Sequence, residues 1–495
     1  MDISLQRRFF SSFKNIGSAK KVCDINSDVV VPDTKEDILR VVLTNADYMI
    51  RSKDVESGRV LVRGELKVSI LYVPESGEGL CTLATDIPFE CEFEVESADS
   101  GCTAIAEMNL ISVDTRILNP RKVMINAQVC VSQKCFCNTD FTWYTDPLDS
   151  IKNAFFKKND TDIRFVNLVT EKTISIEDEI PVRDLDGEVQ LISTPVSFFT
   201  DSADAVGSKF IVKGHAEITA NYLADGKFEN CGTTISFSQI FELPERDILP
   251  DYEAFILPTG NFFELSDGKL SFEIHAVIQI VCTETKKLEY IEDGYVCGAE
   301  TLLGKEEKDV CISERIMHLS ETVQLSRSAE YGIEIINCLS GVTGMPKVSG
   351  EEISVPIAVE IVYTSTDDQI RSFKVYGSAK ISAEIAENES IEGTYASITS
   401  LKPSVSGMDV TIDASINIEA HVQVRSKVHF VCSAEYNEPD DRKAMPSIYM
   451  CRPEESDIWG IAKKYSSNVD MIKKINEIDH TTDTSNRLLV IPRIK

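Results

Sequence analysis

The sequence predicts a mainly β protein, in which three tandem β-sandwich-like repeats are followed by a small α+β module of strand, helix, helix and strand. Apolar and polar residues alternate with period two along three segments of equal length. A second alternating segment follows each of these at a similar distance. From residue 448 onward the apolar period changes to that of a helix. Period two indicates half-buried strands, and the later period indicates amphipathic helices.

The three alternating segments align without gaps, and each ends in a tyrosine. Gly64 and Gly214 hold the same place in the first two, whereas the third has Val355, so a bulge or close backbone approach there is not expected in every copy. The tyrosines are separated by the length of a whole domain, which indicates duplicated domains. The segments are VLVRGELKVSILY (60–72), FIVKGHAEITANY (210–222) and EEISVPIAVEIVY (351–363).

A second strand with an alanine at one fixed position follows in each copy. Turn signals come directly after each tyrosine strand, which predicts antiparallel pairing. Helical periodicity is scarce outside the C-terminal region, with candidates at Thr34–Leu43 and Leu148–Lys157. The matching residues are Val123, Ile125, Ala127 and Val129 in the first copy, Phe272, Ile274, Ala276 and Ile278 in the second, and Val410, Ile412, Ala414 and Ile416 in the third.

These patterns divide the chain into domains. We expect β repeat 1 over residues 20–145, a helical linker over 146–160, β repeat 2 over 161–300, β repeat 3 over 310–432, a linker over 433–447, and the C-terminal module over 448–495.

Charge argues against several classes of partner. The chain has 50 basic and 80 acidic residues, a net charge of -30, which repels nucleic acid and anionic lipid surfaces. The fourteen cysteines are thinly spread, so free thiols in a reducing compartment are expected. The first residues contain no apolar segment of the length that a secretory signal needs, and no later segment is long enough to span a membrane. We therefore expect a cytoplasmic protein.

The C-terminal module has two short helical patterns between two strands. Ile458, Ile461, Ala462 and Tyr465 follow at helical spacing, and a second helix follows from Val469. We expect Ser467 and Asp470 to form a capping box at the start of the second helix. The expected strands begin at Ile448 and end at Pro492.

Several segments of the first copy resemble the SPOCS domain of SipL-type spore coat morphogenetic proteins. They are VPDTKEDILRVV (31–42), the strand with Gly64, Ile87-Pro88-Phe89, and RILNPRK (116–122). The second and third copies keep the strands and lack the Leu-Asn-Pro-Arg segment.

The C-terminal module is similar to a LysM module. The resemblance rests on Ile458-Trp459, Ile461-Ala462, Tyr465, Asn476 and Ile491-Pro492. The usual Gly-Asp-Thr before the first helix reads Glu455-Ser456-Asp457 here, and the usual glycine before the last strand is Asn486, which tolerates a left-handed turn. A charged residue on the sugar-binding loop leads us to expect weak or no binding of N-acetyl glycans. If the module does bind an N-acetyl glycan, the expected glycan groove consists of Ser456, Asp457, Ile458, Asn476, Ile478 and Asp479.

The sequence contains no motif of a common enzyme class. It has no Gly-x-Ser-x-Gly elbow, HExxH helix, P-loop or Rossmann glycine pattern, and the six histidines are dispersed. We therefore expect no enzymatic activity, no cofactor and no metal.

The resemblance implies a non-enzymatic scaffold of spore coat and envelope assembly. Such a protein works in the mother cell around the forespore, where its LysM module docks onto the coat basement ATPase, stage IV sporulation protein A. Other coat proteins are further expected partners. The predicted partner-binding residues are Trp459, at the edge of the apolar stripe of its helix, with Ile448 and Tyr449.

Two alternatives use the same module differently. One is a cell-wall protein whose LysM module binds peptidoglycan, its precursors or other N-acetyl glycans. The other is a wall hydrolase that uses LysM for targeting, which would need a catalytic dyad that the repeats do not show.

Overall fold

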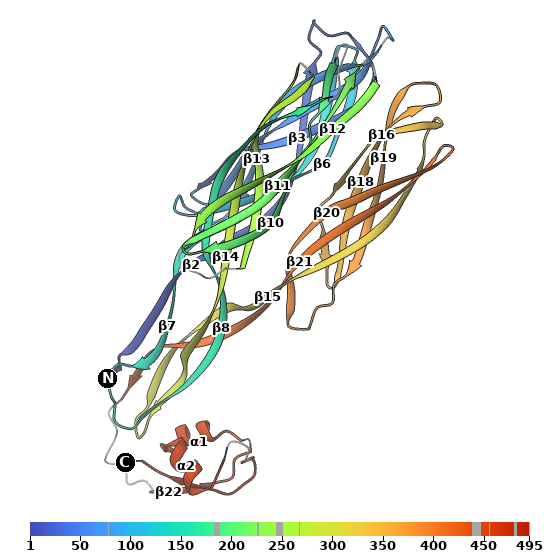
Figure 1. The fold of residues 1–495 in the computed structure, drawn as a ribbon. Helices are drawn as coiled ribbons and strands as arrows, with labels where there is room; N and C mark the ends of the chain where they lie inside the picture. Colours follow the sequence, from blue (N-terminus) through green and yellow to red (C-terminus); the bar gives the residue numbers. More distant parts are fainter. Residues whose placement is uncertain are drawn as a thin grey trace.

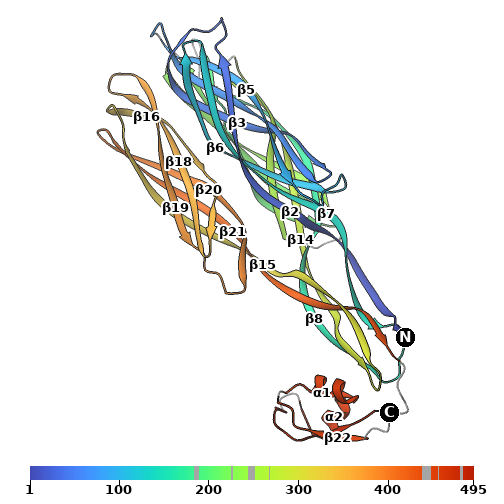
Figure 2. The ribbon, with the colours of Figure 1, turned by 180° about the vertical axis from the view of Figure 1, so that it is seen from behind.

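The computed structural model describes residues 1–77, 79–182, 189–224, 227–243, 251–266, 268–437, 447–454, 456–479 and 483–494. The chain forms an elongated, mainly β body with a small helical module at one end (Figures 1 and 2). The predicted mainly β fold is therefore confirmed.

The first unit of the body, called unit 1, consists of two antiparallel sheets that face each other. One sheet has the strand order β3-β4-β5, and the other contains β2-β7-β6. Leu66 and Val68 of β4 and Ile125 of β7 are buried in the core between the two sheets. The strands are β2 (Leu5–Val30), β3 (Ile38–Glu56), β4 (Arg59–Pro74), β5 (Cys81–Glu94), β6 (Thr103–Asn119) and β7 (Lys122–Pro147).

Two further units follow with a closely similar strand order. Tyr72, Tyr222 and Tyr363 are buried near the end of the central strands β4, β11 and β18. Unit 2 has β8 (Ala154–Pro181), β9 (Val189–Ser193), β10 (Val196–Val206), β11 (Lys209–Ala224), β12 (Lys227–Glu242), β13 (Asp251–Ser266) and β14 (Lys269–Val296). Unit 3 has β15 (Thr301–Ser328), β16 (Ile333–Thr343), β17 (Lys347–Ser349), β18 (Glu352–Ser365), β19 (Ile370–Ser382), β20 (Glu389–Ser406) and β21 (Asp409–Tyr436), and β1 (Asp2–Ile3) pairs with β21.

The longest strands continue beyond the two-layered units and form a stalk. We use this name for the first halves of β2, β8 and β15 with the second halves of β7, β14 and β21, which run toward the module in Figure 1. Bridges between Phe13 and Val166 and between Arg164 and Cys311 join the three strand pairs into one continuous sheet. The stalk core contains Ile163, Leu288, Tyr290, Val310, Val428 and Phe430, with Phe10, Phe141 and Trp143 packed against them.

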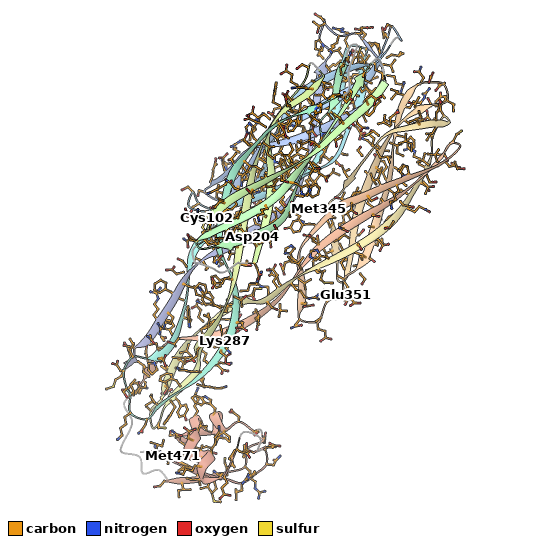
Figure 3. All side chains as sticks on the ribbon, viewed as in Figure 1. Cys102, Asp204, Lys287, Met345, Glu351 and Met471 are labelled. Atoms are coloured by element: carbon orange, nitrogen blue, oxygen red, sulfur yellow. A yellow bond between two sulfur atoms is a disulfide. The ribbon has the colours of Figure 1, made fainter. Side chains whose placement is uncertain are left out.

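The units also contact one another through buried polar groups. The fully buried amide of Gln279 in unit 2 donates to Ala106 O of unit 1 over 2.8 Å and accepts from Ala106 N over 3.0 Å. Both polar ends of this side chain are thus satisfied by the backbone of one residue of a neighbouring unit, which fixes the two units in register. Figure 3 shows side chains crowding the body along its whole length.

The predictions of two helices outside the module are both wrong. A turn precedes β3, which begins at Ile38 inside the segment Thr34–Leu43. Leu148–Lys157 contains the connection between β7 and β8, so the helical linker expected over 146–160 is absent. Pairing with β4 and with β14 gives these backbones long-range hydrogen bonds that outweigh a weak local helical preference.

The expectation of free thiols is wrong for four cysteines. Disulfides join Cys23 to Cys91 and Cys102 to Cys137, both within unit 1, whereas the other ten cysteines form no disulfide. Each pair links residues that are distant in sequence, so only the strand arrangement brings the thiols together.

Candidate functional site: the C-terminal module

The module is a two-stranded sheet covered by two short helices. Its elements are β22 (Ile448–Cys451), α1 (Ile458–Tyr465), α2 (Val469–Ile475) and β23 (Leu489–Pro492). β22 and β23 pair antiparallel, with Ile448 opposite Pro492. The buried core consists of Ile461, Ala462, Ile472, Ile478, Leu489 and Ile491.

Side-chain caps begin both helices. The Asp457 carboxylate accepts from Gly460 N over 3.0 Å at the start of α1. Asn468, and not Ser467, caps α2 by accepting from the backbone N–H groups of Asp470 and Met471. The predicted capping box is therefore wrong, because the buried Ser467 hydroxyl donates to Pro492 O instead.

The left-handed turn expected at Asn486 is confirmed. Its φ is 57°, in the region that favours glycine and that asparagine tolerates.

The three predicted partner-binding residues lie in different environments. Ile448 is 61% exposed on the outer face of β22. The next residue, Tyr449, points to the opposite face, where its ring lies 5.1 Å from that of Tyr465. Trp459 is half-buried on α1 and faces the stalk. Only Ile448 of the three is therefore fully available to a partner.

Trp459 belongs to a contact between the module and the end of β14. Its indole Nε1 donates to Asp293 Oδ2 over 2.9 Å, and Lys463 Nζ lies 2.8 Å from both oxygens of the same carboxylate. The Trp459 ring packs edge-on against Tyr295 with centroids 5.1 Å apart, and Tyr295 OH donates to Ser467 O over 2.7 Å. This contact fixes the module against the stalk.

Asp293 is held in its charged form in this contact. Burial alone would raise its pKa, but hydrogen bonds from Lys463 and Trp459 outweigh burial and leave the pKa below its ordinary value of 3.8. Sequence reasoning missed Asp293 and Tyr295, because nothing in their local pattern distinguishes them from other stalk residues.

Most residues of the alternative glycan groove have structural roles. The Asn476 amide donates to Ile472 O and Val490 O and accepts from Val490 N, so all of its polar atoms are used. The Ser456 hydroxyl lies 2.7 Å from that of Thr484, and Asp457 caps α1. Ile458 packs against the core. Ile478 is buried, and Asp479 is exposed. Glu455 lies outside the described residues.

The outer face of the module sheet is apolar. Ile448 and Met450 alternate with the inward-facing Tyr449 along β22, and they are 61% and 62% exposed. Their cross-strand partners Pro492 and Val490 extend the same face, which we call the outer sheet face. Exposed apolar side chains in register on one small sheet are typical of an interaction surface.

The two signature segments of unit 1 meet in space. The Arg121 guanidinium, from the turn after β6, contacts Asp37 over 2.8 Å, Asp33 over 2.7 Å and Lys35 O over 3.0 Å. Ile38 N donates to Pro120 O over 2.8 Å. The segments 31–42 and 116–122 thus form one closed corner of the unit, held by the side chain of Arg121 and by backbone hydrogen bonds.

Comparison with known proteins gives one match. A family model described as SipL, SPOCS domain, matches residues 37–118, which run from β3 into β6 of unit 1. No curated protein and no solved structure matches the chain. Among the described residues, none of the helices has the length and apolar character needed to cross a membrane. Residues 37–118 of unit 1 are therefore similar to the SPOCS domain of SipL-type proteins.

Proposed function

We propose that this protein is a non-enzymatic scaffold of spore coat and envelope assembly, located in the mother cell around the forespore. The observation that carries the proposal is the SipL-type SPOCS domain over residues 37–118. The proposal extends to the module, which would dock onto the coat basement ATPase, stage IV sporulation protein A.

Units 2 and 3 support a scaffold role because they share structural features with unit 1. Each repeats the central strand that carries the buried tyrosine, and each pairs its first long strand with its last. Three similar units on one chain could contact a polymeric lattice repeatedly, and linked weak contacts raise avidity. Other coat proteins are therefore further proposed partners.

The order of strand, helix, helix and strand supports a LysM-type module. Its polar groove residues are engaged within the module, whereas its outer sheet face is exposed and apolar. These features favour a protein partner over an N-acetyl glycan, because a sugar requires available hydrogen-bonding groups. Within the outer sheet face, Ile448 is the residue that we propose as the main anchor.

The experiment is co-purification of the full chain with the coat ATPase, using Ile448→Glu and the control Ile475→Glu. Both isoleucines lie exposed on the module, at 61% and 49%, but Ile475 is on α2 and outside the outer sheet face. We expect Ile448→Glu to lower retention of the ATPase at least tenfold, because a charge must be desolvated at the interface. Ile475→Glu and the wild type should bind alike.

Circular dichroism and thermal melting check that both variants fold. Normal ATPase binding by folded Ile448→Glu would show that the outer sheet face is not the interface. A parallel incubation with labelled cell wall tests the alternative, and micromolar binding to peptidoglycan would favour the glycan-binding protein.

A further inference from the structure

A compact group of potential metal ligands lies where units 2 and 3 meet. Glu253 comes from β13 of unit 2, whereas Glu314 and His421 come from β15 and β21 of unit 3. One ligand atom from each residue lies within 4.8 Å of the other two. The side chains are 22%, 9% and 9% exposed, respectively, so the group is shielded from solvent.

The distances within this group fit a tetrahedral metal ion. His421 Nδ1 lies 3.3 Å from Glu253 Oε1 and 3.4 Å from Glu314 Oε1. Zinc bonds of about 2.0–2.1 Å in a tetrahedron place neighbouring ligand atoms roughly 3.3–3.4 Å apart. A direct hydrogen bond from the imidazole usually measures about 2.7–3.2 Å, so a bond from His421 to Glu314 would be a long one. The spacing therefore also fits a shared ion between the three side chains.

The outer carboxylate oxygens are held by cations from neighbouring strands. Lys134 Nζ of unit 1 contacts Glu253 Oε2 over 2.9 Å, and Arg164 Nε of unit 2 contacts Glu314 Oε2 over 2.8 Å. Each carboxylate is thus anchored by one oxygen while the other, Oε1, faces His421. Such anchoring of ligands by surrounding groups is typical of metal sites.

Two more contacts complete the surroundings. Gln423 Nε2 donates to Glu314 Oε1 over 3.3 Å, and the Tyr395 ring packs edge-on against His421 with centroids 5.4 Å apart. Arg164 forms ion pairs with both Asp251 and Glu314. With His421 counted as neutral, the three carboxylates exceed the two cations, Lys134 and Arg164, by one negative charge, which favours an added positive ion.

We propose that Glu253, Glu314 and His421 bind a divalent transition metal, zinc by the chemistry of the ligands, which joins units 2 and 3. Two carboxylate oxygens and one imidazole nitrogen are a ligand set that zinc accepts. The sequence predicted no metal because the ligands are dispersed along the chain and only the packing of two units brings them together. The inferred role is structural, in fixing the angle between the units.

The test uses the full chain, equilibrated with micromolar zinc chloride and dialysed, with bound metal measured by mass spectrometry. The variants are His421→Ala and Glu253→Gln. His275→Ala is the control, since His275 Nε2 contacts a single carboxylate, that of Glu273, over 2.9 Å. We expect one zinc per wild-type and control chain, and at least tenfold weaker binding in both site variants. Zinc should raise the melting temperature of the wild type and of the control, and not that of the two site variants.

Three outcomes would overturn the proposal. The wild type could retain no zinc, or both site variants could retain as much as the control. Cobalt substitution could also produce an intense thiolate charge-transfer band, which would place the metal on cysteines outside the two disulfides. Glu253→Gln keeps the test decisive if His421→Ala does not fold, since Glu253 is the more exposed ligand.

Discussion

At the scale of single residues, close packing explains why two copies keep a glycine that the third lacks. A Cβ added to Gly64 would lie 2.8 Å or less from the Phe89 ring and the Met49 carbonyl oxygen. A Cβ added to Gly214 would lie 2.6 Å or less from the nearest atom of the Phe237 ring and from the Phe199 carbonyl oxygen. Both glycines lie beside a β-bulge. At the matching place in unit 3, Val355 pairs with Ala379, so the aromatic ring that would exclude a side chain is absent.

We therefore expect Gly64→Ala and Gly214→Ala each to lower the free energy of unfolding by about 1–3 kcal/mol, the usual cost of overpacking. Chemical denaturation measures the loss. Gly393→Ala is the matched control, because a Cβ in that strand would have no neighbour closer than 3.8 Å. Equal stability of all three variants would contradict the packing explanation.

At the scale of secondary-structure elements, the stalk depends on aromatic packing between strands of different units. Phe430 of β21 is 1% exposed, and its ring centroid lies 4.7 Å from that of Tyr290 and 6.0 Å from that of Phe141. Lys308 Nζ lies 4.6 Å from the Phe141 centroid, a cation–π contact that closes the cluster. Each of the three units contributes at least one of these side chains.

Truncation of the central ring should therefore weaken the whole stalk. We expect Phe430→Ala to lower the free energy of unfolding by roughly 3–5 kcal/mol, because it leaves a cavity among rings that cannot collapse. Phe9→Ala is the control, since Phe9 is 63% exposed on the stalk strand β2. Urea unfolding distinguishes the two, and similar midpoints would show that the aromatic cluster does not stabilise the stalk.

At the scale of the whole molecule, the three units line a partly open pocket of about 250 Å³ with carboxyl groups in its wall. Asp47 comes from unit 1, Asn221 from unit 2 and Glu360 from unit 3. Burial raises the pKa of Glu360 to about 7 and that of Asp47 to about 6. A raised pKa means that the folded state binds a proton more tightly than the unfolded chain, so stability falls as pH rises from about 4.5 toward 7.

Removing the charge of Glu360 should remove part of this pH dependence. We expect Glu360→Gln to raise the free energy of unfolding at pH 8 by an amount on the order of 1–3 kcal/mol, and therefore to raise the melting temperature there. At pH 5 the melting temperature should change little. Glu351→Gln is the control, because this side chain is exposed on unit 3 and is labelled in Figure 3. Identical pH profiles for both variants would contradict a buried, protonated Glu360.

Docking of the module onto the stalk also belongs to this scale. Asp293→Ala removes the acceptor of Trp459 and Lys463, and we expect it to weaken docking by about 2 kcal/mol, or roughly 30-fold. Because docking lowers the pKa of Asp293, its contribution is present above pH 3.8 and is lost as pH falls through the lowered value.

Hydrogen exchange at α1 and at the end of β14 measures the docked state, and exchange should be faster in Asp293→Ala. Asp309→Ala is the control, since Asp309 forms an exposed stalk ion pair with Arg425. Unchanged exchange in Asp293→Ala would show that this carboxylate does not hold the module.

The sequence by itself determined the mainly β class and the approximate positions of the central strands. The predicted segments 60–72, 210–222 and 351–363 lie in β4, β11 and β18, because alternation records which face of a strand is buried. It also determined the left-handed turn at Asn486. Such features depend on residues only a few positions apart.

Only the tertiary structure decided which distant residues meet. Trp459 pairs with Asp293 across 166 positions, and His421 lies beside Glu253 of another unit. For the same reason, the segments Thr34–Leu43 and Leu148–Lys157 form no helix, and each leads from a turn into a strand, β3 or β8. Strand pairing between remote segments supplies backbone hydrogen bonds and buried area that no local window contains, so the stalk, the docked module and the ligand cluster arise from packing rather than from local pattern.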